Sequence, residues 1–307
     1  MDKVKPLFIW AGGKNKMLKH YAPFFPNSSN YSHYVEPFFG GGAMFLHLKK
    51  LNPNLKCTIN DLNKDIIQIY LSIQNFPKEF ISIVDDLEMQ YLPLSKENRK
   101  TFFFKIRNEH AWNYSQWSKI EESAILYFLM RTCFNGIFQL NKNTNGRFGT
   151  PAGLLTQTNS IYSKSNVLEW HYLLQDTVIM TGDWRNVVDT VNWKDTFFFF
   201  DPPYRGGFTS YGQTFTDKDQ ADLLKKAKMI DENGGIVFFS NRDIGDDFWI
   251  DRGNLDLNTF DVTYTAGRRK HKEGKFFAMP AKEILLHSKV IKEELNIKNV
   301  SLEALFG

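Results

Sequence analysis

The sequence predicts an α/β fold in which a Rossmann-like sheet is interrupted by a helical insert. A strand, a glycine-rich turn, a helix and a second strand follow one another between residues 32 and 61. Helical patterns dominate residues 67–164, and strand patterns return only after that stretch. The run Phe197–Phe200 is apolar on both faces, as a central parallel strand covered by helices must be.

The composition indicates a folded protein with a real core. The chain has 307 residues, of which 42% are hydrophobic, so wholesale disorder is excluded. Its formal net charge of +4 allows a polyanionic partner without requiring one. Two cysteines, Cys57 and Cys133, are too few for a disulfide framework, and we expect both to be reduced. The seven histidines show no metal-ligand spacing, so we expect no metal site.

No segment reads as a signal peptide or a membrane span. The apolar run Leu7–Ala11 is too short for a signal peptide, and no stretch reaches the length that crosses a bilayer. We therefore expect an intracellular protein with no membrane partner, present as a monomer or a weak dimer.

The first predicted strand, residues 32–39, runs into the turn Gly40-Gly41-Gly42. A helix follows, with four apolar residues at helical spacing: Met44, Phe45, Leu48 and Leu51. Residues 56–61 form the next strand, which ends in Asp61, where an acid can accept hydrogen bonds from ribose hydroxyls. Glycines at such a turn let backbone amides approach a ligand.

This half-site alone fits NAD, FAD or S-adenosylmethionine, and it fits an ordinary tight turn equally well. The dinucleotide fingerprint G-x-G-x-x-G is incomplete because Met44 and Phe45 follow Gly42 and Ala43. Its absence favours adenosylmethionine, which carries no phosphate, and disfavours a nicotinamide dehydrogenase.

The remaining elements complete the sheet after the insert. We predict a helix over 121–131 and a loop over 141–149 within the insert, and a helix over 217–229 capped by Thr216. Strands are predicted at 177–180, 196–200, 235–240, 260–264 and 283–286. The chain thus divides into a first catalytic and cofactor segment (1–66), a helical target-recognition insert (67–164) and a second catalytic segment (165–307).

The tetrad Asp201-Pro202-Pro203-Tyr204 follows the buried strand, at the strand end where ligands bind in open α/β sheets. These residue types suit an exocyclic amine of a nucleobase. The lone pair of adenine N6 is delocalised into the ring, and two acceptors placed on its hydrogens would free that lone pair. Asp201 supplies a carboxylate, Pro202 a rigidly held carbonyl, and Tyr204 an aromatic face for a base taken out of the duplex. The plain alternative is a proline-rich turn that closes a strand.

With these motifs in this order, the sequence resembles the Dam-type (D12 class) DNA adenine N6-methyltransferases. The matching segments are Phe8-Ile9-Trp10-Ala11-Gly12-Gly13-Lys14, Val35-Glu36-Pro37-Phe38-Phe39-Gly40-Gly41-Gly42, Ile59-Asn60-Asp61, Asn135-Gly136, Phe148-Gly149-Thr150-Pro151, Gly182-Asp183 and the tetrad. The resemblance implies a methyltransferase-type Rossmann-like sheet, S-adenosylmethionine as cofactor, duplex DNA as partner, and a place in the cytoplasm of a bacterial or phage-infected cell. DNA methylation of this kind belongs to restriction–modification.

The resemblance also implies roles for individual residues. The positions expected to bind the cofactor are Trp10, Lys14, Phe38, Gly40, Gly42, Asp61, Asp183 and Asp201. The catalytic positions are Asp201, Pro202, Pro203 and Tyr204. Without the family, Trp10 would be interpreted as core packing and Lys14 as a solvated charge.

Residues 131–153 match the target-recognition segment of the family. The candidates for DNA contact there are Asn135, Gln139, Asn141, Lys142, Arg147 and Pro151. Gln139 stands where GATC-specific members carry an arginine, and Ile9 where they carry a lysine that reaches a base. Arginine and lysine pair well with guanine, whereas glutamine suits adenine, so we expect a GATC-related sequence that is altered or relaxed.

A second DNA-binding candidate is the basic run 267–275, which contains Arg268, Arg269 and Lys270 between two predicted strands. We interpret it as the tip of a hairpin that contacts phosphates, although most charge runs are only solvated loops.

Together these features predict a methyltransferase that acts on N6 of a flipped adenine in duplex DNA. Two alternatives stay open: an N-methyltransferase acting on cytosine N4, RNA or a protein amide, and a non-catalytic DNA-binding relative. An initial Asp in the tetrad favours adenine, because related tetrads for the other substrates often begin with Ser or Asn.

Overall fold

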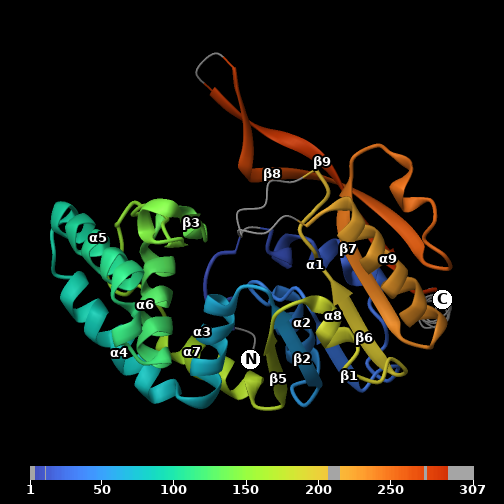
Figure 1. Ribbon diagram of the computed structural model, residues 1–307, viewed down its shortest axis with the longest axis horizontal. Coiled ribbons are helices and arrows are strands. Elements are labelled where there is room, and N and C mark those ends of the chain that lie inside the picture. The colour runs from blue at the N-terminus through green and yellow to red at the C-terminus, as the bar shows by residue number, and fades with distance from the viewer. Residues whose placement is uncertain (1–3, 11, 207–214, 273–274, 290–307) are drawn as a thin grey trace, which may run out of the picture.

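The computed structural model describes residues 4–10, 12–206, 215–272 and 275–289 (Figure 1). Its main feature is a sheet with the strand order β5-β2-β1-β6-β7-β9-β8. The bounds are β1 (His33–Glu36), β2 (Lys56–Asp61), β5 (Thr177–Thr181), β6 (Thr196–Phe200), β7 (Ile236–Asp243), β8 (Asp256–Lys272) and β9 (Lys275–His287). The first five strands in this order are parallel, and β9 runs antiparallel to β7 and β8. The predicted α/β class is confirmed.

Helices cover both faces of the sheet. One apolar cluster holds residues of α2 (Ala43–Leu51), α3 (Lys64–Asn75) and α7 (Lys164–Leu174), and the other holds residues of α8 (Trp184–Val188) and α9 (Asp217–Glu232). Strand β6 alternates between them, with Phe197 and Phe199 in the first cluster and Phe198 and Phe200 in the second. Successive side chains of a strand point to opposite faces, so β6 is buried on both, as its sequence predicts.

The insert forms a helical unit at the other end of the molecule from α9 (Figure 1). It consists of α4 (Pro77–Tyr91), α5 (Lys96–Trp112) and α6 (Lys119–Thr132). Helix α6 contains the predicted helix 121–131 and begins two residues earlier because Ser118 and Glu121 form a capping box. Helix α3 begins at Lys64, so it runs across the predicted boundary at 66–67, and the division into segments stays a prediction.

The prediction of a loop over 141–149 is wrong in part. The short strands β3 (Leu140–Asn141) and β4 (Arg147–Phe148) pair in a hairpin that encloses the 3-10 turn η5 (Lys142–Thr144). The buried Thr144 hydroxyl contacts the carbonyl oxygens of Asn141 (3.0 Å) and Arg147 (2.9 Å), which closes the hairpin from inside. These contacts give a paired structure to part of the segment that the polar composition predicts to be a loop.

The last two strands are longer than predicted. Residues 260–264 and 283–286 are parts of β8 and β9, which form a hairpin that projects beyond the rest of the molecule (Figure 1). The backbone of Arg269 pairs with Ala278 and that of Lys270 with Phe277. The basic run therefore lies along the outer part of this hairpin, and residues 273–274 between the strands lie outside the described residues.

In the part of the chain that the structure describes, no helix is both long and apolar enough to cross a membrane.

Candidate active site

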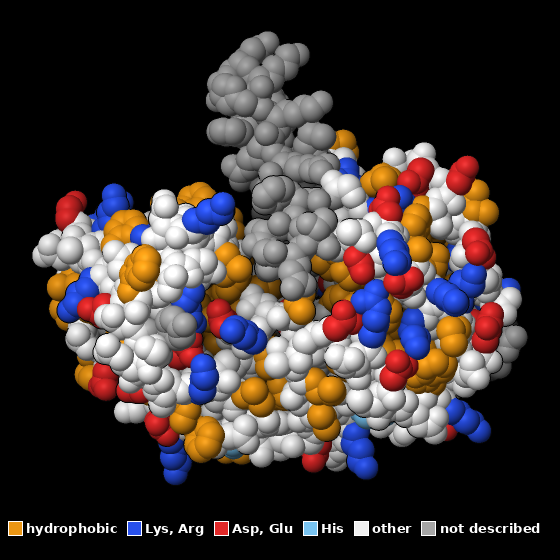
Figure 2. All heavy atoms as spheres, in the orientation of Figure 1, with side chains coloured by type: hydrophobic (Ala, Val, Ile, Leu, Met, Phe, Trp, Pro, Cys, Tyr) orange, Lys and Arg blue, Asp and Glu red, His pale blue; other side chains and the backbone are white. Residues whose placement is uncertain are grey.

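The predicted cofactor and catalytic residues all line one cavity of about 2020 Å³. It lies at the carboxyl ends of β1, β2 and β6, where the strand order reverses between β1 and β6. This reversal is the position at which open α/β sheets bind ligands. Residues of the insert form the opposite wall, and Figure 2 shows the surface hollowed between the two parts. Pockets for one small molecule measure about 300–1,000 Å³, so this cavity has room for more than a cofactor.

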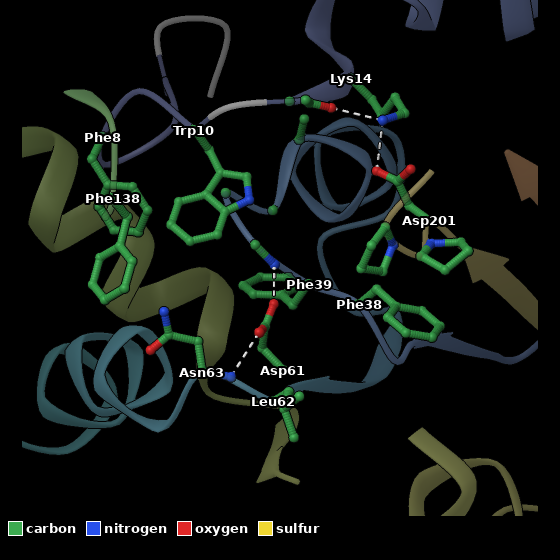
Figure 3. Close-up of a pocket in the computed structure, with 18 of the residues that line it drawn as sticks. Phe8, Trp10, Lys14, Phe38, Phe39, Asp61, Leu62, Asn63, Phe138 and Asp201 are labelled. Carbon is green, nitrogen blue, oxygen red and sulfur yellow. Dashed lines mark hydrogen bonds and ion pairs between the residues drawn. The ribbon is translucent and has the colours of Figure 1, made fainter. Parts of the chain in front are cut away.

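Asp61 ties the end of β2 to the glycine turn. Its two carboxylate oxygens accept hydrogen bonds from the backbone N–H groups of Gly40 (2.8 Å) and Asn63 (2.9 Å), as Figure 3 shows. Burial raises the pKa of Asp61, and these backbone bonds oppose the shift. Each carboxylate oxygen keeps further acceptor capacity, so Asp61 can hold the turn and still bind a ligand hydroxyl.

Trp10 lies directly over the glycine turn (Figure 3). A Cβ atom on Gly40 would lie 2.4 Å from Trp10 Nε1, and one on Gly41 would lie 2.9 Å from Trp10 Cβ. Gly40 also has φ +48°, which a side chain rarely adopts. The indole is 6.1 Å from the ring of Phe138 in the insert. Trp10 is therefore in contact with the turn and close to the insert. Both neighbours are distant in the sequence, so composition alone could not assign a role to Trp10.

Lys14 and Asp201 form a buried ion pair at the end of β6. Lys14 Nζ lies 2.7 Å from Asp201 Oδ2 and donates to the carbonyl of Gly12 at 2.7 Å (Figure 3). Ser240 of the neighbouring β7 donates to Asp201 Oδ1 at 2.8 Å. Burial raises the pKa of Asp201, while Lys14 and Ser240 act in the opposite direction. Lys14 is 5% exposed, so the alternative of a solvated surface charge is wrong.

Buried side chains fix the backbone within the tetrad and directly after it. Gln220 of α9 donates to the carbonyl of Pro203 at 2.7 Å, and Asn241 of β7 donates to Gln220 Oε1 at 3.0 Å. Asn241 Oδ1 in turn accepts from the N–H of Arg205 at 3.1 Å. These contacts anchor the backbone that directly follows the Pro202 carbonyl, which is one of the two predicted acceptors.

Phe38 and Asp183 lie at another part of the cavity wall. The Phe38 ring packs edge-on against Phe215, with 5.8 Å between centroids. Asp183 caps α8 by accepting from the N–H of Arg185 at 2.8 Å, and it also forms an ion pair with the Arg185 guanidinium at 3.0 Å. An aromatic ring and a half-exposed carboxylate therefore contribute to the wall of the same cavity as the glycine turn.

The predicted recognition residues divide into two groups. Asn135, Gln139 and Arg147 line the cavity, whereas Asn141, Lys142 and Pro151 are exposed and do not line it. Gly136 meets the N-terminal segment so closely that a Cβ there would lie 2.5 Å from Cβ of Ile9. The structure therefore places Ile9, which is 64% exposed, beside the Asn135–Gly136 turn.

Arg147 joins the recognition hairpin to two helices. Its guanidinium forms an ion pair with Glu122 of α6 and lies 3.9 Å from Asp65 of α3. Its predicted contact with DNA stays a prediction, and it would require that guanidinium to serve DNA and these carboxylates together.

Sequence reasoning missed Ser240, Gln220, Asn241 and Glu283. Ser240 closes the predicted strand 235–240, so the rule that parallel strands end at one edge could have placed it beside Asp201. The other three carry no motif. Among the described residues, no cluster of three or more His, Cys, Asp or Glu side chains could hold a metal ion.

Comparison with known proteins agrees with this geometry. The sequence model of the D12 class N6 adenine-specific DNA methyltransferases matches residues 10–276. The Type II methyltransferase M.MjaIII of Methanocaldococcus jannaschii is 32% identical over 248 residues, which cover 78% of this chain and 84% of that protein. M1.LlaDCHI, a Type II methyltransferase of Lactococcus lactis subsp. cremoris, is 27% identical over 282 residues, 89% of this chain and 93% of its own.

The DNA adenine methylase of Haemophilus influenzae is 26% identical over 249 residues, with coverage of 78% and 80%. A solved structure, a precorrin 8W decarboxylase of Methanobacterium thermoautotrophicum, covers 93% of this chain at 8% identity and a TM-score of 0.35, too weak a likeness to bear on the assignment. The family match extends over most of the chain and contains both the glycine turn and the tetrad. The chain belongs to the D12 class of N6 adenine-specific DNA methyltransferases, and it is an S-adenosylmethionine-dependent enzyme of that class.

Proposed function

We propose that this protein methylates N6 of an adenine that is flipped out of duplex DNA, with cofactor and base held together in the cavity. The observation that carries the proposal is the position of Asp201. Its carboxylate stands at the switch point of the sheet, in the same cavity as the glycine turn. A carboxylate acceptor and a cofactor turn that share one cavity suit direct transfer between two bound ligands.

The residues around the glycine turn fit S-adenosylmethionine, which supplies a methyl group activated by a sulfonium. Asp61 has acceptor capacity for ribose hydroxyls, and Asp183 is a half-exposed acceptor for an adenine amine. The faces of Trp10 and Phe38 offer apolar contact, and Gly40 lets the backbone approach closely.

The tetrad provides what the target base needs. Asp201 and the Pro202 carbonyl accept the two hydrogens of N6, and the ring of Tyr204 stacks on the base. As N6 becomes more tetrahedral its lone pair is released toward the methyl group. The proton that N6 loses after transfer passes to Asp201 or to water.

We propose a recognition sequence related to GATC but altered or relaxed. Ile9 lies beside Gly136, and both Ile9 and Gln139 line the cavity. Neither side chain carries the positive charge with which lysine and arginine bind guanine. Mapping of N6-methyladenine on treated plasmid DNA, read by single-molecule sequencing, gives the sequence directly. Methylation confined to GATC would contradict this proposal and leave the enzymatic activity intact.

The activity itself is tested by incubation of the protein with labelled adenosylmethionine and duplex DNA, followed by digestion to nucleosides. We expect label on N6-methyladenine. Label on 4-methylcytosine, or on RNA in place of DNA, would overturn the substrate, and no transfer at all would favour a non-catalytic relative.

Replacement of Asp201 provides the matched test of the site. Asp201→Ala should lower the rate of transfer by at least ~10²-fold, as loss of a central electrostatic group does, while binding of DNA persists. Asp176→Ala, which removes an exposed carboxylate that does not line the cavity, is the control and should keep wild-type activity. Full activity of Asp201→Ala would remove Asp201 from the mechanism.

A further inference from the structure

We infer that Glu283 of β9 is a positioning residue that sets the ring of Tyr204 for stacking against the target base. The inference rests on the proposed function, because Tyr204 has this task only if a base enters the cavity. Glu283 itself belongs to no motif of the sequence, and its role follows from its contacts.

One carboxylate oxygen of Glu283 accepts two phenol hydroxyls. Tyr204 Oη donates to Oε1 at 2.9 Å, and Tyr21 Oη of α1 (Leu18–Tyr21) donates to the same atom at 2.7 Å. Both distances are in the ordinary range of O–H···O hydrogen bonds, and that of Tyr21 is also in the charge-assisted range. Glu283 is 2% exposed and Tyr21 is fully buried, so the acceptor is held by buried neighbours, while both Glu283 and Tyr204 border the cavity.

Burial of a carboxylate raises the free energy of the folded protein unless hydrogen bonds compensate for the lost hydration. The two phenol bonds to Glu283 provide this compensation and therefore stabilise the observed position of its side chain. The phenol bond fixes the position of the outer end of the Tyr204 ring, and the ring centroid lies 4.8 Å from Lys14 Nζ. An aromatic platform stacks well only in a narrow range of orientations. Glu283, which lines the same cavity, thus holds Tyr204 by its phenol oxygen.

The support for Glu283 comes from the base of the projecting hairpin. Its backbone pairs with Phe260 of β8 on one side and Arg242 of β7 on the other. The Phe260 ring lies 5.8 Å from that of Tyr21. Glu283 therefore lies in the same β8–β9 hairpin as Arg269 and Lys270, so the acceptor for Tyr204 and the predicted DNA contact belong to one hairpin.

The test compares variants by steady-state and single-turnover methylation of duplex DNA. Tyr204→Phe removes the donor, and Glu283→Leu removes the acceptor. We expect either change to lower kcat roughly tenfold, as loss of a hydrogen bond to a charged group does, with KM for adenosylmethionine within about twofold of wild type. The double variant should be no slower than Glu283→Leu, because both changes break the same bond.

Two further variants separate positioning from a general structural role. Glu283→Gln keeps an acceptor oxygen and should restore kcat to within about threefold of wild type. Tyr21→Phe removes the other bond to Oε1, leaves Tyr204 attached, and should keep at least roughly half of the wild-type kcat.

Three outcomes would each overturn the inference. They are a wild-type kcat in Tyr204→Phe, multiplicative losses of kcat in the double variant, and a Glu283→Gln variant as slow as Glu283→Leu. If thermal denaturation shows that Glu283→Leu is not folded, the comparison of Tyr204→Phe with Tyr21→Phe tests the inference instead. Failure of the wild-type protein to form N6-methyladenine would instead overturn the proposed function, so the two failures are distinguishable.

Discussion

Asp201 accepts an amino hydrogen most strongly while it is ionised, because a charged acceptor forms a stronger hydrogen bond than a protonated carboxyl group does. Burial raises the pKa of Asp201, and among the groups that lower it Lys14 comes first. Because protonation weakens Asp201 as an acceptor and removes the base that could take the N6 proton, activity falls as pH drops through this pKa. Lys14→Gln removes the strongest lowering influence, so we expect the acidic limb of the kcat–pH profile, measured at saturating adenosylmethionine, to move to higher pH.

Ser240→Ala should move that limb in the same direction by less, since its hydrogen bond also lowers the pKa of Asp201. Lys16→Gln, on the same 3-10 turn but exposed, is the matched control and should leave the limb in place. An acidic limb in Lys14→Gln that coincides with wild type would show that Lys14 does not set the ionisation of Asp201.

The glycine turn offers a second test at the level of single residues. Gly40→Ala would bring a Cβ to 2.4 Å from the Trp10 indole, so either the turn or Trp10 must shift. We expect at least ~10-fold weaker binding of adenosylmethionine by calorimetry, because a displacement of the turn breaks its fit to a ligand. Gly245→Ala has the same backbone strain, with φ +82° and open space around the Cβ, and should bind the cofactor as wild type does.

At the scale of elements, the sequence predicts best where one local signal dominates. Strands β2 and β6 have the predicted bounds 56–61 and 196–200. An acid marks the end of each, Asp61 as the last residue of β2 and Asp201 directly after the apolar run of β6. Helix α9 starts where Thr216 caps it, and its capping box includes Asp219. The β3–β4 hairpin was missed because its closure depends on the buried hydroxyl of Thr144, which polar composition conceals.

Helix α5 carries a buried histidine that makes stability depend on pH. His110 is fully buried and, within the described residues, neither ring nitrogen has a hydrogen-bond partner. Burial, and after it the charge of Arg147, lower the pKa of His110 from 6.5 to about 4, while Glu122 acts in the opposite direction. The unfolded chain binds the proton first as pH falls, so the free energy of unfolding decreases between pH 6.5 and 4.

We expect this group to contribute a loss of about 3 kcal/mol across that window, measured by urea denaturation. His110→Gln removes the titrating group and should flatten the dependence by a comparable amount. The two proteins should show parallel behaviour from pH 7 to 8, where the imidazole is neutral in both states. An equally steep decline in His110→Gln would assign the pH dependence to other groups.

At the scale of the whole molecule, the cavity exists because distant parts of the chain meet at one edge of the sheet. The carboxyl-end rule predicts that Asp61 and Asp201 lie together, and the family resemblance adds Trp10 and Lys14. Neither could predict the bond between Tyr21 and Glu283, which joins residues 262 positions apart through the register of the last two strands. Such contacts depend on tertiary packing, which leaves no periodic signal in the sequence.

The projecting hairpin leads to a prediction about the salt dependence of DNA binding. If the outer part of β8 contacts phosphates, Arg268, Arg269 and Lys270 release counterions when DNA binds. Replacement of all three by Ala should then reduce the slope of log K against log salt by about 3, measured by fluorescence anisotropy with a DNA duplex.

The matched control changes the net charge by the same amount on the insert. Lys78, Lys96 and Lys100 are exposed residues of α4 and α5 that do not line the cavity. Replacement of these three by Ala should leave the slope near that of wild type, because a general change in charge acts weakly beyond a Debye length of about 8 Å. Equal slopes in the two triple variants would mean that the hairpin contributes only net charge, whereas a reduction confined to the hairpin variant places the phosphates along β8.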